Sequence, residues 1–402
     1  MKTIRCDIQL PASKSESNRA LTIAAYGGFT PGFQNLSKSS DTQLLKHIFE
    51  DLGKSEAVDV RDCGTAARFM LTFLACHEGR WLLTGTERMK QRPMQDLIVA
   101  LRELNADIQC VEKDGFLPIR IVGKPLNGDK IAVDVMRSSQ FASSLLLAAP
   151  MWPNGLELEL EGELNSLPYI DMTISMMRHF GSDVERNNRK VVVKPKTYCP
   201  TKFVIEPDWS AASYWYEIAA LSEDCDIFLK NLSLQSLQGD AKVANMAELL
   251  GVQTIVEKNG LRLKKLPHAS ANFSFDFSDT PDLFPAVVVA CAGLGREARF
   301  TGIQNLSVKE SDRVVAISKE LSKIGARFER VSDNELWLKP SDLQNVSCKT
   351  LKFNSYNDHR IAMALAPLRL TFSCAEIDQP EVVAKSYPDF WSDFANAISF
   401  LL

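Results

Sequence analysis

The feature that most constrains the fold of this chain is an order of elements that recurs five times along it. In each copy an amphipathic, helix-like stretch ends at Gly or Asn, and a strand-like stretch follows. Gly and Asn readily take the left-handed backbone conformation that ends a helix, so each is expected to be such a stop. The stops are Gly53, Asn105, Gly181, Gly251 and Gly325.

The spacing of these stops favours a repeated α/β unit over a solenoid. The copies lie roughly fifty to seventy-five residues apart, which is longer than the common solenoid periods. A unit of that length holds several strands and two helices. The pattern predicts six similar units, three on each side of a domain change near residues 204–208. The alternative is an irregular α/β protein whose helices merely end in Gly.

Length and charge narrow the class of protein. With 402 residues the chain is long enough for two or more domains, each with its own core. The net charge of −4 argues against a nucleic acid or a membrane surface as partner, because both attract basic surfaces. The longest apolar runs are too short to span a bilayer, and the first residues lack the apolar core of a signal peptide. We therefore expect a cytoplasmic protein.

Cysteine and histidine usage points the same way. The nine cysteines include no C-x-x-C pair and are odd in number, which indicates mostly buried, reduced thiols rather than a disulfide framework. The five histidines show no H-x-x-x-H pairing. We therefore expect no metal site.

Residues 11–20 place two cations and several hydroxyls at a junction between a strand-like run and a helix-like run at residues 20–26. Free backbone N–H groups and the helix dipole favour an anion at such a junction, so Lys14, Ser15 and Arg19 form a candidate phosphate cradle. The alternative is that Ser13 and Glu16 form a capping box on solvated surface. The segment alone leaves both interpretations open.

Polar segments of this kind recur at six other helix starts. Taken singly, each fits a solvated helix end; Asp282, for example, fits a helix cap as well as a general base. Lys309 and Arg313 are spaced i, i+4 and are expected to share a helix face. Seven such starts on a chain of negative net charge predict one anion-rich site. The six segments begin at Cys63, Arg88, Arg137, Asp279, Asn305 and Asn357; a further polar segment, which is not counted among these helix starts, begins at Lys385.

At this point the residues resemble a known family. Residues 11–20 are similar to the P-G-S-K-S-x-S-N-R-A element of the 5-enolpyruvylshikimate-3-phosphate (EPSP) synthases. Further similar elements follow in the family's order: CGTAAR, GTERMKQRP, SSQF, SLPYID, SLQGD, TPD, VKESDR, YNDHR and AKSYPDF. The resemblance implies an α/β fold of two domains, each an inside-out α/β barrel of βαβαββ repeats. The implied lobes are residues 14–206, mainly for shikimate 3-phosphate, and residues 1–13 with 207–402, for phosphoenolpyruvate and catalysis.

The resemblance also implies the reaction and the partners. The family transfers the enolpyruvyl group of phosphoenolpyruvate to the 5-hydroxyl of shikimate 3-phosphate, without a metal or an organic cofactor, on the route to chorismate and the aromatic amino acids. Two phosphates and two carboxylates enter one site, so several cations must converge there. The expected partners are these two small molecules, with no nucleic acid and no membrane, and we expect a monomer.

Site residues are carried over position by position. Asp282 resembles the base for the 5-hydroxyl, Glu310 an acid or base at C3, and Lys14 the acid on the departing phosphate. Gly64 matters because any Cβ there would intrude on phosphoenolpyruvate or on the inhibitor glyphosate. The residues implied for shikimate 3-phosphate are Lys14, Ser15, Arg19, Ser138, Ser139, Gln140, Ser166, Tyr169, Asp282, Asn305 and Lys309. Those implied for phosphoenolpyruvate are Lys14, Gly64, Arg92, Gln140, Arg313, Arg360 and Lys385.

Two departures from the family pattern stand out. Asp62 replaces the usual Asn beside the CGTAAR element, and Arg61 is a candidate to neutralise it. The segment 54–61 is shorter than in the family, which predicts that one N-terminal repeat is truncated. Two rival functions therefore stay open: a non-catalytic or weakened homologue, and the sister enzyme that transfers enolpyruvyl to UDP-N-acetylglucosamine.

Overall fold

The structure is a computed structural model that describes residues 3–30, 32–267, 273–339, 343 and 351–399. Contacts divide the chain into two compact units. The N-terminal unit consists of Lys14–Ser37 and Asp41–Ile205. The C-terminal unit consists of Met1–Ser13, Lys38–Ser40 and Glu206–Leu402. These units differ from the lobes implied by the resemblance in residues 38–40 and 206.

The N-terminal unit contains two successive βαβαββ units, preceded by α1 (Lys14–Gly27) and α2 (Ser40–Glu50). Each forms a four-stranded sheet, in the orders β2-β3-β5-β4 and β6-β7-β9-β8, whose first pair is parallel and whose other pairs are antiparallel. The first unit comprises β2 (Ala57–Asp59), α3 (Gly64–Cys76), β3 (Gly79–Thr84), α4 (Glu87–Lys90), α5 (Gln95–Glu103), β4 (Asp107–Cys110) and β5 (Ile119–Gly123). The second comprises β6 (Lys130–Asp134), α6 (Ser139–Ala148), β7 (Leu156–Glu161), α7 (Leu167–His179), β8 (Asp183–Asn187) and β9 (Lys190–Lys194).

The C-terminal unit repeats this order. Its first sheet, β1-β10-β12-β11, takes β1 from the start of the chain and the other strands from beyond residue 206. Its members are β1 (Thr3–Ile8), α8 (Trp209–Leu221), β10 (Asp224–Lys230), α9 (Val243–Leu249), β11 (Val252–Glu257) and β12 (Gly260–Lys265). The second comprises β13 (Phe273–Asp276), α10 (Phe284–Gly293), β14 (Ala298–Thr301), α11 (Arg313–Ser322), β15 (Arg327–Ser332) and β16 (Glu335–Lys339). A shorter third part holds β17 (Leu351–Phe353), α12 (His359–Leu365), β18 (Ala375–Ile377) and α13 (Phe390–Ile398).

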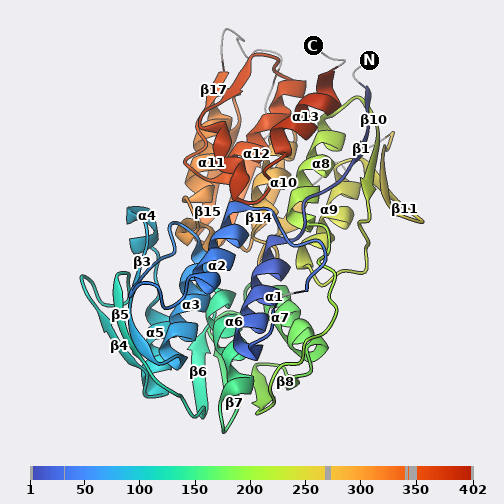
Figure 1. The fold of residues 1–402 in the computed structure, drawn as a ribbon. Coiled ribbons are helices and arrows are strands. Elements are labelled where there is room, and N and C mark those ends of the chain that lie inside the picture. The colour runs from blue at the N-terminus through green and yellow to red at the C-terminus, as the bar shows by residue number, and fades with distance from the viewer. Residues whose placement is uncertain (1–2, 31, 268–272, 340–342, 344–350, 400–402) are drawn as a thin grey trace. The chain divides into compact units, whose positions relative to one another are not determined.

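Helices form the interior of each unit, and the sheets lie outside them. In the N-terminal unit α1, α3, α6 and α7 pack against one another (Figure 1). In the C-terminal unit α10 contacts α8, α11 and α12. The sequence explains the burial: α10 is apolar on every face and α6 combines apolar residues with small serines, so both are stable only when neighbours surround them.

The helix stops predicted from the sequence are confirmed. Gly53, Asn105, Gly181, Gly251 and Gly325 have φ values of 87°, 64°, 92°, 83° and 81°, all in the left-handed region. The mixed α/β class with repeated βαβ units is confirmed as well, and the sheets among the described residues stay open rather than closing into a barrel.

Other expectations need correction. Among the residues that the structure describes, four of the six expected units are complete; the other two show α1 and α2 with an isolated bridge between Gln34 and Val204, and the two-stranded sheet of β17 and β18. The shortened segment 54–61 still carries a strand, the three-residue β2. The first helix begins at Lys14, six residues before the expected start, because the polar residues after Ser13 continue the helix.

Of the cysteines in the described ranges, seven are free thiols, but Cys374 is disulfide-bonded, so the expectation of reduced thiols is wrong at that position. Cys199 is exposed, whereas Cys63, Cys225 and Cys291 are buried. Within the described ranges, no helix is both long enough and apolar enough to span a membrane.

Candidate functional site

Arg313 is the centre of a charged cluster in the C-terminal unit. It is the first residue of α11, which Asp312 caps by accepting a hydrogen bond from the backbone N–H of Val315 at 3.1 Å. Its side chain is 1% exposed, and each of its three guanidinium nitrogens donates to a different carboxylate. Nη1 lies 2.8 Å from Asp282 Oδ1, Nη2 lies 3.0 Å from Glu310 Oε2, and Nε lies 3.0 Å from Asp358 Oδ2.

Asp358 and Arg360 enter this cluster from the start of α12. Asp358 is the N-cap of that helix and accepts a hydrogen bond from the Arg360 N–H at 3.0 Å. This cap fixes the first turn of α12 and therefore orients both Asp358 and Arg360. Arg360 Nη2 then donates to Asp282 Oδ2 at 2.7 Å.

Asp282 is therefore held between two arginines. The N-cap of α10 is Leu283 and makes no side-chain cap bond, so the interpretation of Asp282 as a helix cap is wrong. Burial raises the pKa of the Asp282 carboxyl, but Arg360, Arg313 and Lys309 outweigh burial and hold that pKa well below its usual range. In this arrangement Asp282 is a carboxylate with little affinity for a proton.

Asp240 is a charged residue near this cluster to which the sequence analysis gave no role. It lies in the 3-10 helix Gly239–Lys242, is buried, and accepts a hydrogen bond from the Ser210 hydroxyl. Burial, assisted by the nearby Asp282 carboxylate, raises the pKa of Asp240 to about 7. The motif SLQGD, which ends at Asp240, is the signal that could have identified it.

The other predicted residues of the C-terminal unit lie on short 3-10 helices. Asn305 is buried in Gln304–Val308, and Lys385 is the buried last residue of Pro380–Lys385. Lys309 caps the first of these helices in an extended conformation, four residues before α11 begins. The expectation that Lys309 and Arg313 share one helix face is therefore wrong, although Lys309 still acts electrostatically on Asp282.

In the N-terminal unit Arg19 joins three helices. From α1 it donates through Nε to Thr173 Oγ1 at 2.7 Å and through Nη2 to Ser143 Oγ at 3.3 Å and to the Tyr169 carbonyl at 3.2 Å. Its Nη1 donates to the carbonyl of Ser15 at 3.0 Å. Burial lowers the pKa of Arg19 to about 10, so it remains a cation at neutral pH. Sequence reasoning missed Thr173 and Ser143.

Hydroxyl and amide groups stand at the starts of α6 and α7. Ser138 is the N-cap of α6 and accepts a hydrogen bond from the Gln140 N–H at 3.3 Å, beside the buried Ser139. Gln140 Nε2 donates to Thr65 Oγ1 at 3.2 Å, which joins the start of α6 to the start of α3. Ser166, buried and at the N-cap of α7, has a left-handed backbone with φ of 60°.

The start of α3 is crowded by two arginines. A Cβ placed on Gly64 would lie 2.7 Å from Arg92 Nη1 and 2.8 Å from Arg68 Nη1, far inside normal contact. Arg68 is fixed there by hydrogen bonds to the carbonyls of Gly64 and Pro93, both at 3.1 Å. Gly64 and Arg92 are predicted site residues, whereas Arg68 has no role predicted from the sequence.

Lys14, in the first turn of α1, forms a largely buried ion pair with Asp41 of α2, with Nζ 3.0 Å from Oδ2. Asp41 was not expected beside it. Arg61 pairs with Asp59, with Nε 3.2 Å from Oδ2, and the neutralisation of Asp62 by Arg61 stays a prediction.

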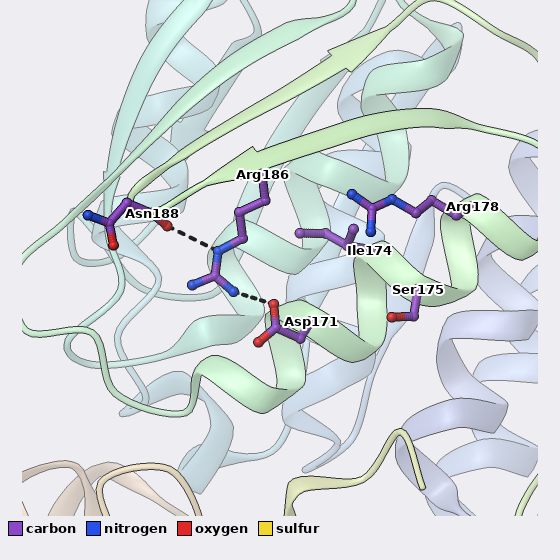
Figure 2. A pocket seen from close by; sticks show the side chains of 6 residues that line it. All are labelled: Asp171, Ile174, Ser175, Arg178, Arg186 and Asn188. Carbon is purple, nitrogen blue, oxygen red and sulfur yellow. Dashed lines mark hydrogen bonds and ion pairs between the residues drawn. The ribbon is translucent and has the colours of Figure 1, made fainter. Parts of the chain in front are cut away.

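A separate hollow of about 480 Å³ lies between α7 and β8. Figure 2 shows Arg186 there, with hydrogen bonds to Asp171 and to the carbonyl of Asn188, and Arg178 across Ile174. None of the predicted site residues lines this hollow. Among the described residues, no group of three or more His, Cys, Asp or Glu side chains is arranged to hold a metal ion.

Comparisons with known proteins agree with this inventory. The family model for EPSP synthase (3-phosphoshikimate 1-carboxyvinyltransferase) matches residues 54–394. A 3-phosphoshikimate 1-carboxyvinyltransferase from Bacteroides fragilis is 43% identical over 396 residues, covering 98% of this chain and 95% of the relative. One from Syntrophobacter fumaroxidans is 33% identical, covering 97% and 96%.

Solved structures show the same fold. An EPSP synthase from Acinetobacter baumannii superposes with a TM-score of 0.75 at 22% identity, covering 98% of this chain and 96% of that one. The family match spans most of the chain, and the relatives match along nearly their whole length. The chain therefore belongs to the EPSP synthase (3-phosphoshikimate 1-carboxyvinyltransferase) family.

Proposed function

We propose that this chain transfers the enolpyruvyl group of phosphoenolpyruvate to the 5-hydroxyl of shikimate 3-phosphate and releases phosphate. Family membership supports the reaction. The observation that carries the proposal is the position of Asp282, whose two carboxylate oxygens are held by Arg313 and Arg360. This arrangement couples anion binding to the activation of a base.

The coupling follows from the charges. The carboxylate and phosphate groups of phosphoenolpyruvate bind best to the same guanidinium groups that donate hydrogen bonds to Asp282 in the free protein. When an anion takes over hydrogen bonds from Arg313 and Arg360, their field on Asp282 is partly neutralised. The pKa of Asp282 then rises from its depressed value, and Asp282 becomes a competent base only when the substrate is present.

The steps balance as an addition followed by an elimination. The 5-oxygen attacks C2 of the enol, its proton passes to Asp282, and C3 receives a proton to give a tetrahedral intermediate. Loss of phosphate and of one C3 proton then restores the double bond. Glu310 is suited to proton transfer at C3, because its link to Arg313 fixes it at the same cluster. Lys14 is suited to protonate the departing phosphate, with Asp41 orienting its ammonium group.

The two units divide the binding of the substrates. In the N-terminal unit Arg19 supplies a buried cation, and Ser15, Ser138, Ser139, Ser166 and Tyr169 supply groups at helix starts for shikimate 3-phosphate. Asn305 and Lys309 add to this set from the C-terminal unit. Gly64 with Arg92, Gln140, Arg313, Arg360 and Lys385 would bind phosphoenolpyruvate. Charge-assisted hydrogen bonds of this kind contribute about 1.5–3 kcal/mol each.

The test is steady-state phosphate release with both substrates. We expect turnover that requires both, and we expect Asp282→Asn to lower kcat by about 10²–10⁴-fold while the KM values change little. Asp279→Asn is the matched control, because Asp279 is a nearby carboxylate paired with Lys242 at the surface. Turnover of phosphoenolpyruvate with UDP-N-acetylglucosamine but not with shikimate 3-phosphate as acceptor would contradict the proposal. Binding of both substrates without phosphate release would contradict it as well.

A further inference from the structure

A second concave site lies in the N-terminal unit, away from the residues proposed for the substrates. It is a hollow of about 720 Å³, within the range of small-molecule sites. Its walls come from α1, the segment after α1, α2 and the end of α3. None of the residues assigned to either substrate lines it. The proposed transfer reaction therefore leaves this hollow without a role.

Aromatic rings form part of the walls of the hollow, beside aliphatic side chains such as Leu21 and Leu36. Phe73 and His77, at the end of α3, stack with ring centroids 3.8 Å apart and an interplanar angle of 16°. Phe49 of α2 meets Phe73 edge to face at 5.1 Å and 69°. Phe29 and Phe33 line the hollow as well. Rings arranged in this way favour a flat aromatic ligand, which can stack or meet them at an edge.

His77 adds a directed hydrogen-bond acceptor. Its Nδ1 lies 2.8 Å from the carbonyl of Phe73, and a carbonyl only accepts, so the proton resides on Nδ1. Burial lowers the pKa of His77, which keeps the ring neutral at physiological pH. Nε2 is then an acceptor, and no described residue donates to it. A ring hydroxyl or ring N–H on a ligand would satisfy it.

Opposite charges stand at the edge of the hollow. Lys46 and Glu50 line it one helical turn apart on α2, with Nζ 3.7 Å from Oε1 and side chains 43% and 53% exposed. Such a long, solvated pair contributes little to stability and can exchange partners readily. An adjacent cation and anion complement the carboxylate and ammonium groups of a zwitterion. An aromatic body with a zwitterionic head is the chemistry that fits both wall and edge.

We propose that this hollow binds a free aromatic amino acid that carries a ring hydroxyl or N–H. The ring lies among Phe49, Phe73 and His77, its donor meets His77 Nε2, and Lys46 and Glu50 receive the carboxylate and the ammonium group. The proposal is independent of the proposed reaction, because it uses none of the same residues.

The test is a ligand-observed NMR titration of the purified full-length protein with L-tyrosine. We expect saturable binding at one site that phosphoenolpyruvate does not displace. Tyramine, which lacks the carboxylate, and 3-(4-hydroxyphenyl)propionate, which lacks the amine, should each bind at least about five-fold more weakly. L-leucine should not bind. The absence of saturable binding, or an affinity for either truncated compound equal to that for L-tyrosine, would overturn the proposal.

Variants locate the site. Lys46→Gln should weaken L-tyrosine binding about five- to twenty-fold, and Ala25→Trp, which places an indole in the hollow, should abolish it. Lys54→Gln is the matched control, since Lys54 is an exposed lysine paired with Asp51 and does not line the hollow. Phosphate release should be unchanged in Lys46→Gln, which shows that the variant is folded. Wild-type affinity in both Lys46→Gln and Ala25→Trp would exclude this hollow as the site.

Discussion

Replacing Asp358 with Asn tests whether the carboxylate cluster organises the C-terminal unit. Asp358 is completely buried and serves three donors. Its Oδ2 accepts from Arg313 Nε and from the Ser311 hydroxyl, both at 3.0 Å, and its Oδ1 accepts from the Arg360 N–H at 3.0 Å. An amide keeps the shape but has one oxygen, so its NH₂ group must face donors on one side.

The magnitude follows from these contacts. Removing one partner of a buried ion pair costs about 3–5 kcal/mol, because the remaining charge is left uncompensated. Arg313 keeps its bonds to Asp282 and Glu310, so we expect the lower end, about 3 kcal/mol. A domain of about 200 residues loses roughly 2–4 °C in Tm for each kcal/mol, which predicts a fall of about 6–12 °C.

Differential scanning calorimetry of the full chain measures this shift. The control is Asp279→Asn, which breaks a surface ion pair whose members, Lys242 and Asp279, are 52% and 36% exposed. Exposed pairs contribute about 0–1 kcal/mol, so the control should lower Tm by no more than about 4 °C. If Asp358→Asn is no more destabilising than the control, the carboxylate cluster around Arg313 does not stabilise the C-terminal unit.

Two further predictions concern the start of α3 and the buried Asp240. Gly64→Ala should raise the KM for phosphoenolpyruvate about ten-fold or more, because the new Cβ displaces Arg92 and Arg68. The KM for shikimate 3-phosphate should change less. Steady-state kinetics measures both KM values, and equal changes in the two would contradict the prediction. The pKa of Asp240 is about 7 in the folded protein against 3.8 as its ordinary value. The folded state therefore binds this proton more tightly, and its contribution to stability is lost as pH rises from about 4 to about 7. Asp240→Asn should reduce this pH dependence of the free energy of unfolding by up to about 1 kcal/mol per pH unit. Urea unfolding at several pH values measures the dependence. If the variant and the wild type show the same dependence, Asp240 does not titrate in that range.

Local features of the fold, such as helix ends and helix starts, could be predicted from the sequence. The helix stops at Gly53, Asn105 and Gly181 have the left-handed backbone that their residue types favour. Helix starts at Gly64 and near Phe284 lie where the sequence predicts them. These features depend on a few neighbouring residues, so the residue types alone are sufficient to predict them. The start of α1 was misplaced, because helix propensity says little about polar residues that tertiary contacts bury.

Most residues of the cluster around Arg313, and most polar residues at the helix starts of the N-terminal unit, could be identified from the resemblance to the family. The resemblance did not give their partners. Asp358 bonds to Arg313 across 45 positions and Asp282 bonds to Arg313 across 31, and neither pairing has a local signal. Lys14 with Asp41, and Arg68 with the carbonyl of Pro93, are likewise visible only in the folded chain.

The sequence by itself determined the repeated α/β units, the positions where helices end, and the family to which the chain is similar, because these depend on residue type and local order. The tertiary structure decided which charges meet. It places three carboxylates around Arg313, holds the pKa of Asp282 low and that of Asp240 high, and opens the aromatic hollow beside α2. Electrostatic energies depend on distance and burial, and packing between residues far apart in the chain sets both.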